Sequence, residues 1–328
     1  MSEQLEFRKA IRDALDEEIE RDPAVVFFGE DVAAAGGVFM TTPGLHEKHG
    51  QERVFDTPIS ELAMAGAAFG AAVTGLRPVI EIMFGDFMAL PMDSLVNQSA
   101  KYWYVSNEQA SVPLVVRSAV GAGGRFGAMH SQIHGTWFQG IPGIKIAAPS
   151  NPADAKGLLK SAIRDDNPVI FLEHKRLYST KGPEPTQDTV PLGKAAFARE
   201  GSDITIVSAL RGVRDSLDAA EELAGDGIDA EVVDIRSLRP LDHETVLQSV
   251  AKTNRLMVVE EGTRVGGWAA NLLGIVAAEG LHDLDDAWIV TTEDTPAPYS
   301  PTLEDAWLPG PAEIAAAVRA RLGVAAPS

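Results

Sequence analysis

Short apolar segments alternate with helix-like segments along most of this chain of 328 residues. The segments Ala24–Phe28, Pro78–Met83 and Val169–Leu172 are apolar at nearly every position, so neither face of such a strand is suited to water. Strands of this kind are typical of a parallel sheet that is covered by helices on both faces. The sequence therefore predicts an α/β fold with mostly parallel sheets.

A segment rich in proline and polar residues, Lys181–Pro191, interrupts this alternation. Such a composition is typical of a linker, and a second series of apolar segments and helices begins at Asp203. We expect two α/β domains, over residues 1–185 and 201–328, joined by a linker over residues 186–200. The chain is long enough for two domains of ordinary size.

The composition excludes several functional classes. A formal net charge of −19 argues against nucleic-acid binding, which needs a basic surface. It is compatible with a basic protein partner, although acidic surfaces more often serve solubility. The absence of cysteine excludes disulfides and thiolate metal sites and fits a reducing cytoplasm. Since no secretory signal or membrane-spanning apolar run is present, we expect a cytoplasmic protein that makes no membrane contact.

Glu61 stands at the head of Leu62–Val73, a segment made only of Ala, Gly, Leu, Met, Phe and Val. Burying a carboxylate costs several kcal/mol unless the group is paired or takes up a proton. A buried acid in such a place is a candidate proton donor or acceptor near neutral pH. The alternative is that Ser60 caps the helix and that an acid in the first turn simply suits the helix dipole.

A glycine-rich segment, Gly121–Gly127, precedes His130 and His134. It resembles a dinucleotide-binding fingerprint, but no helix and ribose-binding acid follow at the required distance. The two histidines are four residues apart, yet no carboxylate or H-E-x-x-H motif completes a metal site. We expect His130 to serve proton transfer or substrate binding. A structural loop histidine remains the alternative.

Two turns carry weaker signals. Gly225–Gly227 reads GDG, like the start of a motif for a metal-bound diphosphate, but it lies between a helix and a strand, where a C-cap turn is expected. Arg164–Pro168 also separates a helix from a strand. It can be interpreted as a capping turn or as a group of oxygen ligands for a cation.

Longer motifs carry a resemblance to a known family. In order along the chain they are GED, RVFDTPISE, GLRPVIEIMFGDF, MHSQ, IPGIKIAAPSNPADAKGLLKSAIRDDNPVIF and TPAPYSPTLED. Together they resemble the β chain of the thiamine-diphosphate-dependent first component of 2-oxo acid dehydrogenase complexes, of the pyruvate, branched-chain or acetoin type. The resemblance covers nearly the whole chain. It implies a pyrimidine-binding domain over residues 1–185 and a transketolase-type C-terminal domain over residues 201–328.

The resemblance also implies roles for single residues. Glu61 matches the glutamate that hydrogen-bonds the aminopyrimidine ring of thiamine diphosphate and so helps to activate the thiazolium carbon. Phe87 matches the aromatic residue that packs on this ring, and Met83 lies beside it. His130 matches the loop histidine that contacts substrate and helps acyl transfer to lipoamide. A structural potassium site, formed mostly by backbone carbonyls, is implied at Leu114, Ala162, Ile163, Asp165 and Asn167.

The family explains one departure. A complete enzyme of this kind needs a GDG…N motif for magnesium and diphosphate, and this chain has none in a suitable context. A separate α chain carries it, so we expect a chain that is inert alone, in a tetramer of two α and two β chains. A further partner is the dihydrolipoyl acyltransferase core, which we expect the acidic C-terminal domain to bind. Pyruvate is the expected substrate.

Other functions stay open at this stage. The chain could serve acetoin or branched-chain 2-oxo acid dehydrogenase, or it could be a non-catalytic scaffold that keeps the fold. A stand-alone nucleotide-dependent oxidoreductase is less well supported, because it needs a G-x-G-x-x-G at a strand–helix junction.

Overall fold

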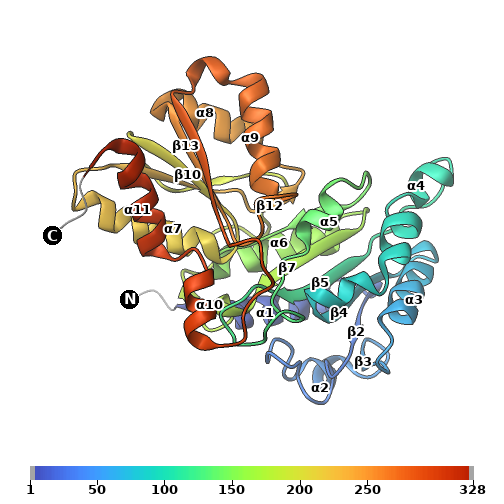
Figure 1. Cartoon of the computed structure of the whole chain (residues 1–328). Coiled ribbons are helices and arrows are strands. Elements are labelled where there is room, and N and C mark those ends of the chain that lie inside the picture. Colours follow the sequence, from blue (N-terminus) through green and yellow to red (C-terminus); the bar gives the residue numbers. More distant parts are fainter. Residues whose placement is uncertain (1–3, 325–328) are drawn as a thin grey trace.

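The computed structural model describes residues 4–324, which form two α/β units (Figure 1). The N-terminal unit has a seven-stranded sheet in the order β12-β6-β7-β5-β4-β2-β3. All of its neighbouring strands are parallel except β12, which is antiparallel to β6. The strands are β2 (Val25–Gly29), β3 (Val54–Asp56), β4 (Arg77–Phe84), β5 (Val115–Val120), β6 (Lys145–Ala147), β7 (Val169–His174) and β12 (Ser237–Arg239).

Helices cover both faces of this sheet, as its continuously apolar strands require. Helices α1 (Phe7–Arg21) and α6 (Pro152–Arg164) pack together over one face, with α2 (Leu45–His49) beside α1. Helix α3 (Glu61–Val73) covers the other face and buries Met64, Ala65 and Ala68 against it. The sequence starts α6 at a defined point, because the Asn151 side chain accepts a hydrogen bond from the backbone N–H of Asp154 and Pro152 occupies the first turn.

The C-terminal unit has a five-stranded sheet in the order β14-β13-β10-β11-β9, in which only β9 is antiparallel. Helices α7 and α11 lie on one face, and α8 and α9 lie on the other (Figure 1). The strands are β9 (Ala196–Arg199), β10 (Ile204–Ser208), β11 (Ala230–Asp234), β13 (Arg255–Glu260) and β14 (Asp286–Thr291); the helices are α7 (Arg211–Ala224), α8 (His243–Thr253), α9 (Trp268–Glu279), α10 (Pro301–Trp307) and α11 (Pro311–Leu322).

The two units are not simply consecutive along the chain. Strand β9 lies inside the segment 186–200 that was expected to be a linker. Strand β12 belongs to the expected C-terminal domain by position, but it pairs with β6 of the N-terminal sheet. One continuous apolar core also runs through both units. Within residues 4–324, no helix is long and apolar enough to cross a membrane.

Several short elements differ from the elements predicted from the sequence or were not predicted. Residues Phe87–Trp103 read as one helix, but the chain forms a 3-10 turn (Gly85–Ala89), a π-helical segment (Ser94–Ser99) and a short α4 (Tyr102–Val105). Pro91, which has no N–H to donate, lies between the first two. The others are β1 (Leu5–Glu6), which pairs with β8 (Lys181–Gly182), α5 (Gly135–Gln139), and 3-10 turns at Lys175–Leu177 and Leu281–Asp283.

Candidate functional site

The site lies along one edge of the N-terminal sheet. Strands β2, β4, β5 and β7 are parallel neighbours, so their C-terminal ends meet at the same edge. Glu30 follows β2, the segment from Phe84 to Phe87 ends β4, the loop with His130 follows β5, and Lys175 follows β7. The carboxyl ends of parallel strands are where ligands bind in sheets of this kind.

Glu61 and Glu30 form a pair of buried carboxylates at the N-terminus of α3. Glu61 is the first residue of the helix and is 6% exposed, and Glu30 is 7% exposed. Burial, and then the charges of Glu61 and Asp31, raise the pKa of Glu30, while a hydrogen bond from the backbone of Ser60 lowers it. Glu30 Oε1 has no hydrogen-bond partner among residues 4–324. Two adjacent acids, one with a free oxygen, can hold a proton or receive a donor from a ligand.

The Ser60 side chain does not cap α3, so the interpretation of Ser60 as a helix cap has no support in the geometry.

Aromatic side chains pack together beside the two carboxylates. The His130 ring packs edge-on against Phe84, with ring centroids 4.6 Å apart, and against Phe87 at 5.3 Å. Met83, on the same strand as Phe84, is half-buried. The structure thus brings His130 and Phe87 into direct contact.

Lys175, directly after β7, holds the loop that carries His130. Its Nζ donates to the main-chain carbonyl of His130 at 2.7 Å and lies over the rings of Phe84 and Phe126. Burial lowers the pKa of Lys175 to about 8, with nearby carboxylates, first that of Glu261, opposing the change. An ammonium group with this pKa can lose its proton near the physiological range.

Four polar atoms beside the loop lack hydrogen-bond partners within residues 4–324. Asp86 Oδ2, Ser131 Oγ and both ring nitrogens of His134 are buried without a hydrogen bond from any described residue. Burial lowers the pKa of His134, although Asp86 Oδ1, 4.0 Å from Nε2, opposes the change. Ser131 and His134 also line a cavity of about 570 Å³. Buried polar groups in native proteins are nearly always paired, so water or a ligand is expected at this place.

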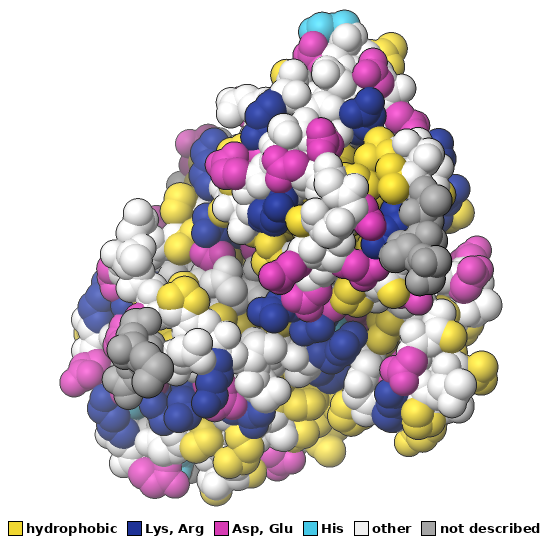
Figure 2. Space-filling model, turned by 90° about the vertical axis from the view of Figure 1, so that its left-hand side faces the viewer, with side chains coloured by type: hydrophobic (Ala, Val, Ile, Leu, Met, Phe, Trp, Pro, Cys, Tyr) yellow, Lys and Arg dark blue, Asp and Glu magenta, His cyan; other side chains and the backbone are white. Residues whose placement is uncertain are grey.

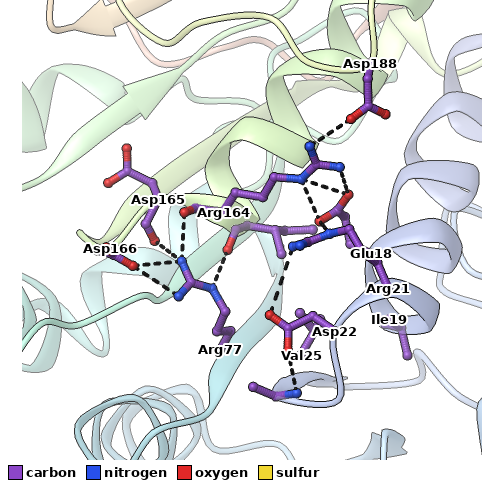
Figure 3. A network of polar contacts seen from close by, with 12 residues as sticks. Glu18, Ile19, Arg21, Asp22, Val25, Arg77, Arg164, Asp165, Asp166 and Asp188 are labelled. Atoms are coloured by element: carbon purple, nitrogen blue, oxygen red, sulfur yellow. Dashed lines mark hydrogen bonds and ion pairs between the residues drawn. The ribbon is translucent and has the colours of Figure 1, made fainter.

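Four of the five residues expected to bind potassium lie at or just after the C-terminal end of α6, and Figure 3 shows one of them, Asp165, beside Arg77. Arg77 lies against the same turn and donates to the backbone carbonyls of Ile163, Arg164 and Asp165 at 2.8–3.0 Å. Its guanidinium also pairs with the Asp166 carboxylate at 3.0 Å. The Arg77 guanidinium therefore already stabilises the negative end of the α6 dipole.

The other expected ligands are close to this turn. The Leu114 carbonyl accepts from Val169 N at 2.8 Å, and the Ala162 carbonyl accepts from Asp165 N at 3.3 Å. Asn167 donates from its backbone and its amide to the Asp165 carboxylate. A carbonyl oxygen has two lone pairs, so these groups keep acceptor capacity beside the bonds that they make. The potassium site stays a prediction.

The sequence analysis did not single out Lys175, Asp86 or Glu30. Their positions were a usable signal, because each lies within two residues of the C-terminal end of a strand in the parallel sheet. His174, also on β7, pairs with Glu261 of the C-terminal unit at 2.8 Å. The sequence alone does not predict this ion pair, because 87 positions separate the two residues.

Comparison with known proteins decides the family. Residues 3–181 match the transketolase pyrimidine binding domain, and residues 193–314 match the transketolase C-terminal domain. The chain is 45% identical to the β subunit of acetoin:2,6-dichlorophenolindophenol oxidoreductase of Cupriavidus necator, over 97% of this chain and 98% of the relative. It is 45% identical to the pyruvate dehydrogenase E1 component β subunit of Rickettsia conorii, over 96% and 98%. The 2-oxoisovalerate dehydrogenase β subunit of Bacillus subtilis is 44% identical, over 94% and 96%.

The chain belongs to the family of 2-oxo acid and acetoin dehydrogenase β subunits. The predicted resemblance, the two-domain α/β fold and the class of enzyme are thereby confirmed. A dehydrogenase β subunit implies an α partner. Among solved structures, a split-gene transketolase described as an inactive β4 tetramer matches with a TM-score of 0.81 over 97% of this chain and 98% of that one. At 23% identity, that match supports the fold alone.

Proposed function

We propose that this dehydrogenase β subunit acts on pyruvate, with thiamine diphosphate bound between it and its α chain. The observation that carries the proposal is the buried pair of Glu61 and Glu30 at the head of α3. It occurs in a chain that is about as similar to pyruvate dehydrogenase β subunits as to any other relative named above.

The residues present fit the aminopyrimidine half of this cofactor. Glu61 offers a buried carboxylate to a ring nitrogen, and Glu30 Oε1, which has no hydrogen-bond partner within residues 4–324, can accept from a further donor of the ligand. Phe87 and Met83, at the end of β4, would form the apolar wall for the ring. When bound, thiamine diphosphate supplies the electron sink that decarboxylation needs.

Several groups of the chain would then move or hold protons. The Glu61 carboxylate would accept from the cofactor ring, and burial together with the charge of Glu61 raises the pKa of Glu30, which favours a proton on Glu30. His130 presents an imidazole at the mouth of the site, held by Phe84, Phe87 and the Lys175 hydrogen bond. An imidazole so placed can exchange a proton with a substrate or with an incoming acyl acceptor.

The diphosphate half needs another chain. The GDG sequence Gly225–Gly227 lies at the end of α7, where Asp226 pairs with Arg319 at 2.6 Å. Asp226 is thus engaged in packing α11 against α7, which supports an α chain as the holder of magnesium and diphosphate. Large apolar side chains that remain exposed on and around α3 and α4 would face that chain: Ile59, Leu62, Leu90, Tyr104 and Val105.

Assembly beyond this contact is part of the proposal. We place the chain in a tetramer of two α and two β chains, with potassium at the end of α6 as a structural ion. The acidic C-terminal domain would dock a basic segment of a dihydrolipoyl acyltransferase, and such binding should weaken as salt rises. Sizing chromatography of the chain co-expressed with its α chain tests the tetramer.

Glu61→Gln in the reconstituted αβ complex tests the site. The variant should keep its melting temperature and lose exchange of the thiazolium proton by orders of magnitude, because an amide cannot exchange a proton with the aminopyrimidine ring as a carboxyl group can. Glu47→Gln, on the exposed α2, is the matched control and should exchange at the normal rate. Near-normal exchange in Glu61→Gln would show that Glu61 does not hold the cofactor.

Acetoin is the second candidate substrate, since the relative from Cupriavidus necator is named for it and is equally similar. Turnover of pyruvate, acetoin and a branched-chain 2-oxo acid by the same complex separates the candidates. A complex that prefers acetoin or the branched-chain acid by tenfold or more in kcat/KM would overturn the pyruvate assignment. A scaffold would show no turnover with any of them.

A further inference from the structure

A cavity of about 900 Å³ lies between the two units, and none of its lining residues belongs to the site described above. Its walls are the β6–α6 junction, the segment after β7 and the first turns of α7. In Figure 2, Lys and Arg side chains gather in the recess between the two halves of the molecule. Cavities of this size at a domain boundary are typical binding places for small molecules.

Four cationic side chains line the cavity: Lys181, Arg211, Arg214 and Arg236. Such a cluster is unusual on a chain with a net charge of −19. Acidic residues lie there too, namely Asp154, Glu184 and Asp218, so the net charge of the lining is small. The case for an anion therefore rests on how the guanidinium groups are held.

Two arginines are fixed by bidentate pairs and keep donors free. Arg236 uses Nε and Nη2 on Asp154, at 2.9 and 2.7 Å. Arg211 uses Nε and Nη2 on Asp215, at 3.1 and 2.6 Å. In neither residue does Nη1 make a hydrogen bond to the described part of the chain. A guanidinium has five N–H donors, so each pair orients the group and leaves an edge for a second anion.

Further features raise the local potential for an anion. Helices α6 and α7 both begin at the cavity, with Pro152 and Arg211 in its wall. At α7 the first N–H groups carry the positive end of the helix dipole, whereas the start of α6 already has the Asn151 cap and the Asp154 carboxylate. No side chain caps α7, whose N-cap residue Leu210 has φ of 53°, a costly conformation for leucine. Lys181 makes no ion pair within residues 4–324.

The cavity also has an apolar wall. It is formed by Leu177, Val190, Val213 and Leu217 together with Pro183 and Pro185. Hydroxyl and amide groups of Ser150, Thr180, Thr186 and Gln187 add a polar surface to the lining. A ligand that satisfies all three surfaces has an anionic end, a polar middle and an apolar ring or chain.

We propose that this cavity binds a nucleoside phosphate, with its phosphate on Arg211 and Arg236 and its base against the apolar wall. Arg236 follows β11 of the C-terminal unit and pairs with Asp154 of the N-terminal unit. Because residues of both units line the cavity, a ligand on Arg236 and Arg211 would also contact the N-terminal unit around Asp154. It stabilises the folded chain by an amount that grows with ligand concentration.

The experiment uses ADP as the probe and the full-length chain, in buffer without magnesium or thiamine diphosphate. ADP should bind in calorimetry and raise the melting temperature, while adenosine and inorganic phosphate, each lacking one half, should bind at least tenfold more weakly. Arg211→Gln and Arg236→Gln should each weaken ADP binding about tenfold, the effect of one lost charge-assisted contact. Arg321→Gln, on α11 and outside the cavity lining, is the matched control.

If Arg236→Gln fails to fold, Arg211→Lys still tests the proposal. Lysine keeps the positive charge but lacks the paired N–H donors of the guanidinium, so this variant should weaken ADP binding severalfold. The proposal is overturned if ADP neither binds nor stabilises the chain, or if both glutamine variants bind ADP as the unmodified chain does. It is also overturned if inorganic phosphate binds as tightly as ADP, since the apolar wall would then contribute nothing.

Discussion

Lys175 Nζ donates a 2.7 Å hydrogen bond to the main-chain carbonyl of His130, 45 positions earlier in the chain. The bond connects the end of β7 to the loop after β5. A buried ammonium group thus anchors the loop that carries the candidate histidine to the end of β7, beside the bond from Gln132 to Asp86 at the end of β4.

Lys175→Met should release this loop. Methionine keeps the apolar contact with Phe84 but cannot donate, so turnover of the αβ complex should fall about tenfold, as expected for one lost charge-assisted hydrogen bond. Trypsin cleavage after Arg125, within the same loop, should become faster. Lys9→Met, at an exposed position on α1, is the control. Unchanged cleavage and turnover would show that the bond does not hold the loop.

Glu30→Gln should stabilise the folded chain at pH 7. The pKa of Glu30 is raised in the folded state, so its charge opposes folding above the pKa of the unfolded chain. Glutamine removes that charge beside Glu61 and can still accept from the Ser60 backbone. The gain should vanish below about pH 3, where Glu30 is protonated in both states. Urea denaturation at the two pH values measures it; a loss of stability at pH 7 would contradict the prediction.

Arg77→Lys should destabilise the chain by about 2 kcal/mol. Lysine keeps the charge but cannot reach the three carbonyls at the end of α6 together with Asp166, as the guanidinium does in Figure 3. Chemical denaturation gives the difference in unfolding free energy. Arg12→Lys, in a partly exposed pair with Asp13, should change stability by less than about 0.5 kcal/mol.

Potassium should raise the melting temperature of the αβ complex relative to sodium or tetramethylammonium at equal ionic strength. The physical reason is that the carbonyls of Leu114 and Ala162 keep acceptor capacity beside the α6 turn. Equal melting temperatures in all three salts would contradict the potassium site. Arg77 would then be the cation that interacts with this end of α6.

Asp234→Asn should make stability less dependent on pH. Burial, and then the charge of Asp154, raise the pKa of Asp234 to about 7, so the folded state binds its proton more tightly than the unfolded chain. Its charge therefore lowers stability as pH rises from about 4 to 7, by at most about 4 kcal/mol. Asparagine mimics the protonated form and can serve both Ser150 and the Arg236 backbone. Relative to the unmodified chain, the variant should gain stability between pH 5 and 8; a constant difference would contradict this.

Much of the fold follows from local patterns. Apolar strands such as Val25–Gly29 and the amphipathic α6 with its Asn–Pro start are written in neighbouring residues. The segment Phe87–Trp103 misleads, because its composition favours a helix while Pro91 breaks the hydrogen-bond pattern. Short elements such as β12 and β9 depend on partners far away in sequence, and no local pattern predicts them.

The candidate site divides in the same way. Glu61 stands out because an acid beside a wholly apolar segment is unusual, and His130 because it follows a glycine-rich loop. Glu30 and Lys175 owe their properties to burial by other segments, so only the folded chain shows them. The contact of Arg77 with the carbonyls of α6 is likewise a product of the fold, since 86 positions separate it from Ile163.

Because β12 pairs with β6, the N-terminal sheet cannot be completed until part of the C-terminal unit has been synthesised. During synthesis, β6 remains an open edge until residue 239 has emerged, long after the rest of its sheet is complete. An unpaired edge strand invites pairing with other chains. A fragment cut at the apparent linker would keep that open edge permanently. Domain exchange between relatives should therefore move Ser237–Arg239 together with the N-terminal unit, or the hybrid will aggregate rather than assemble.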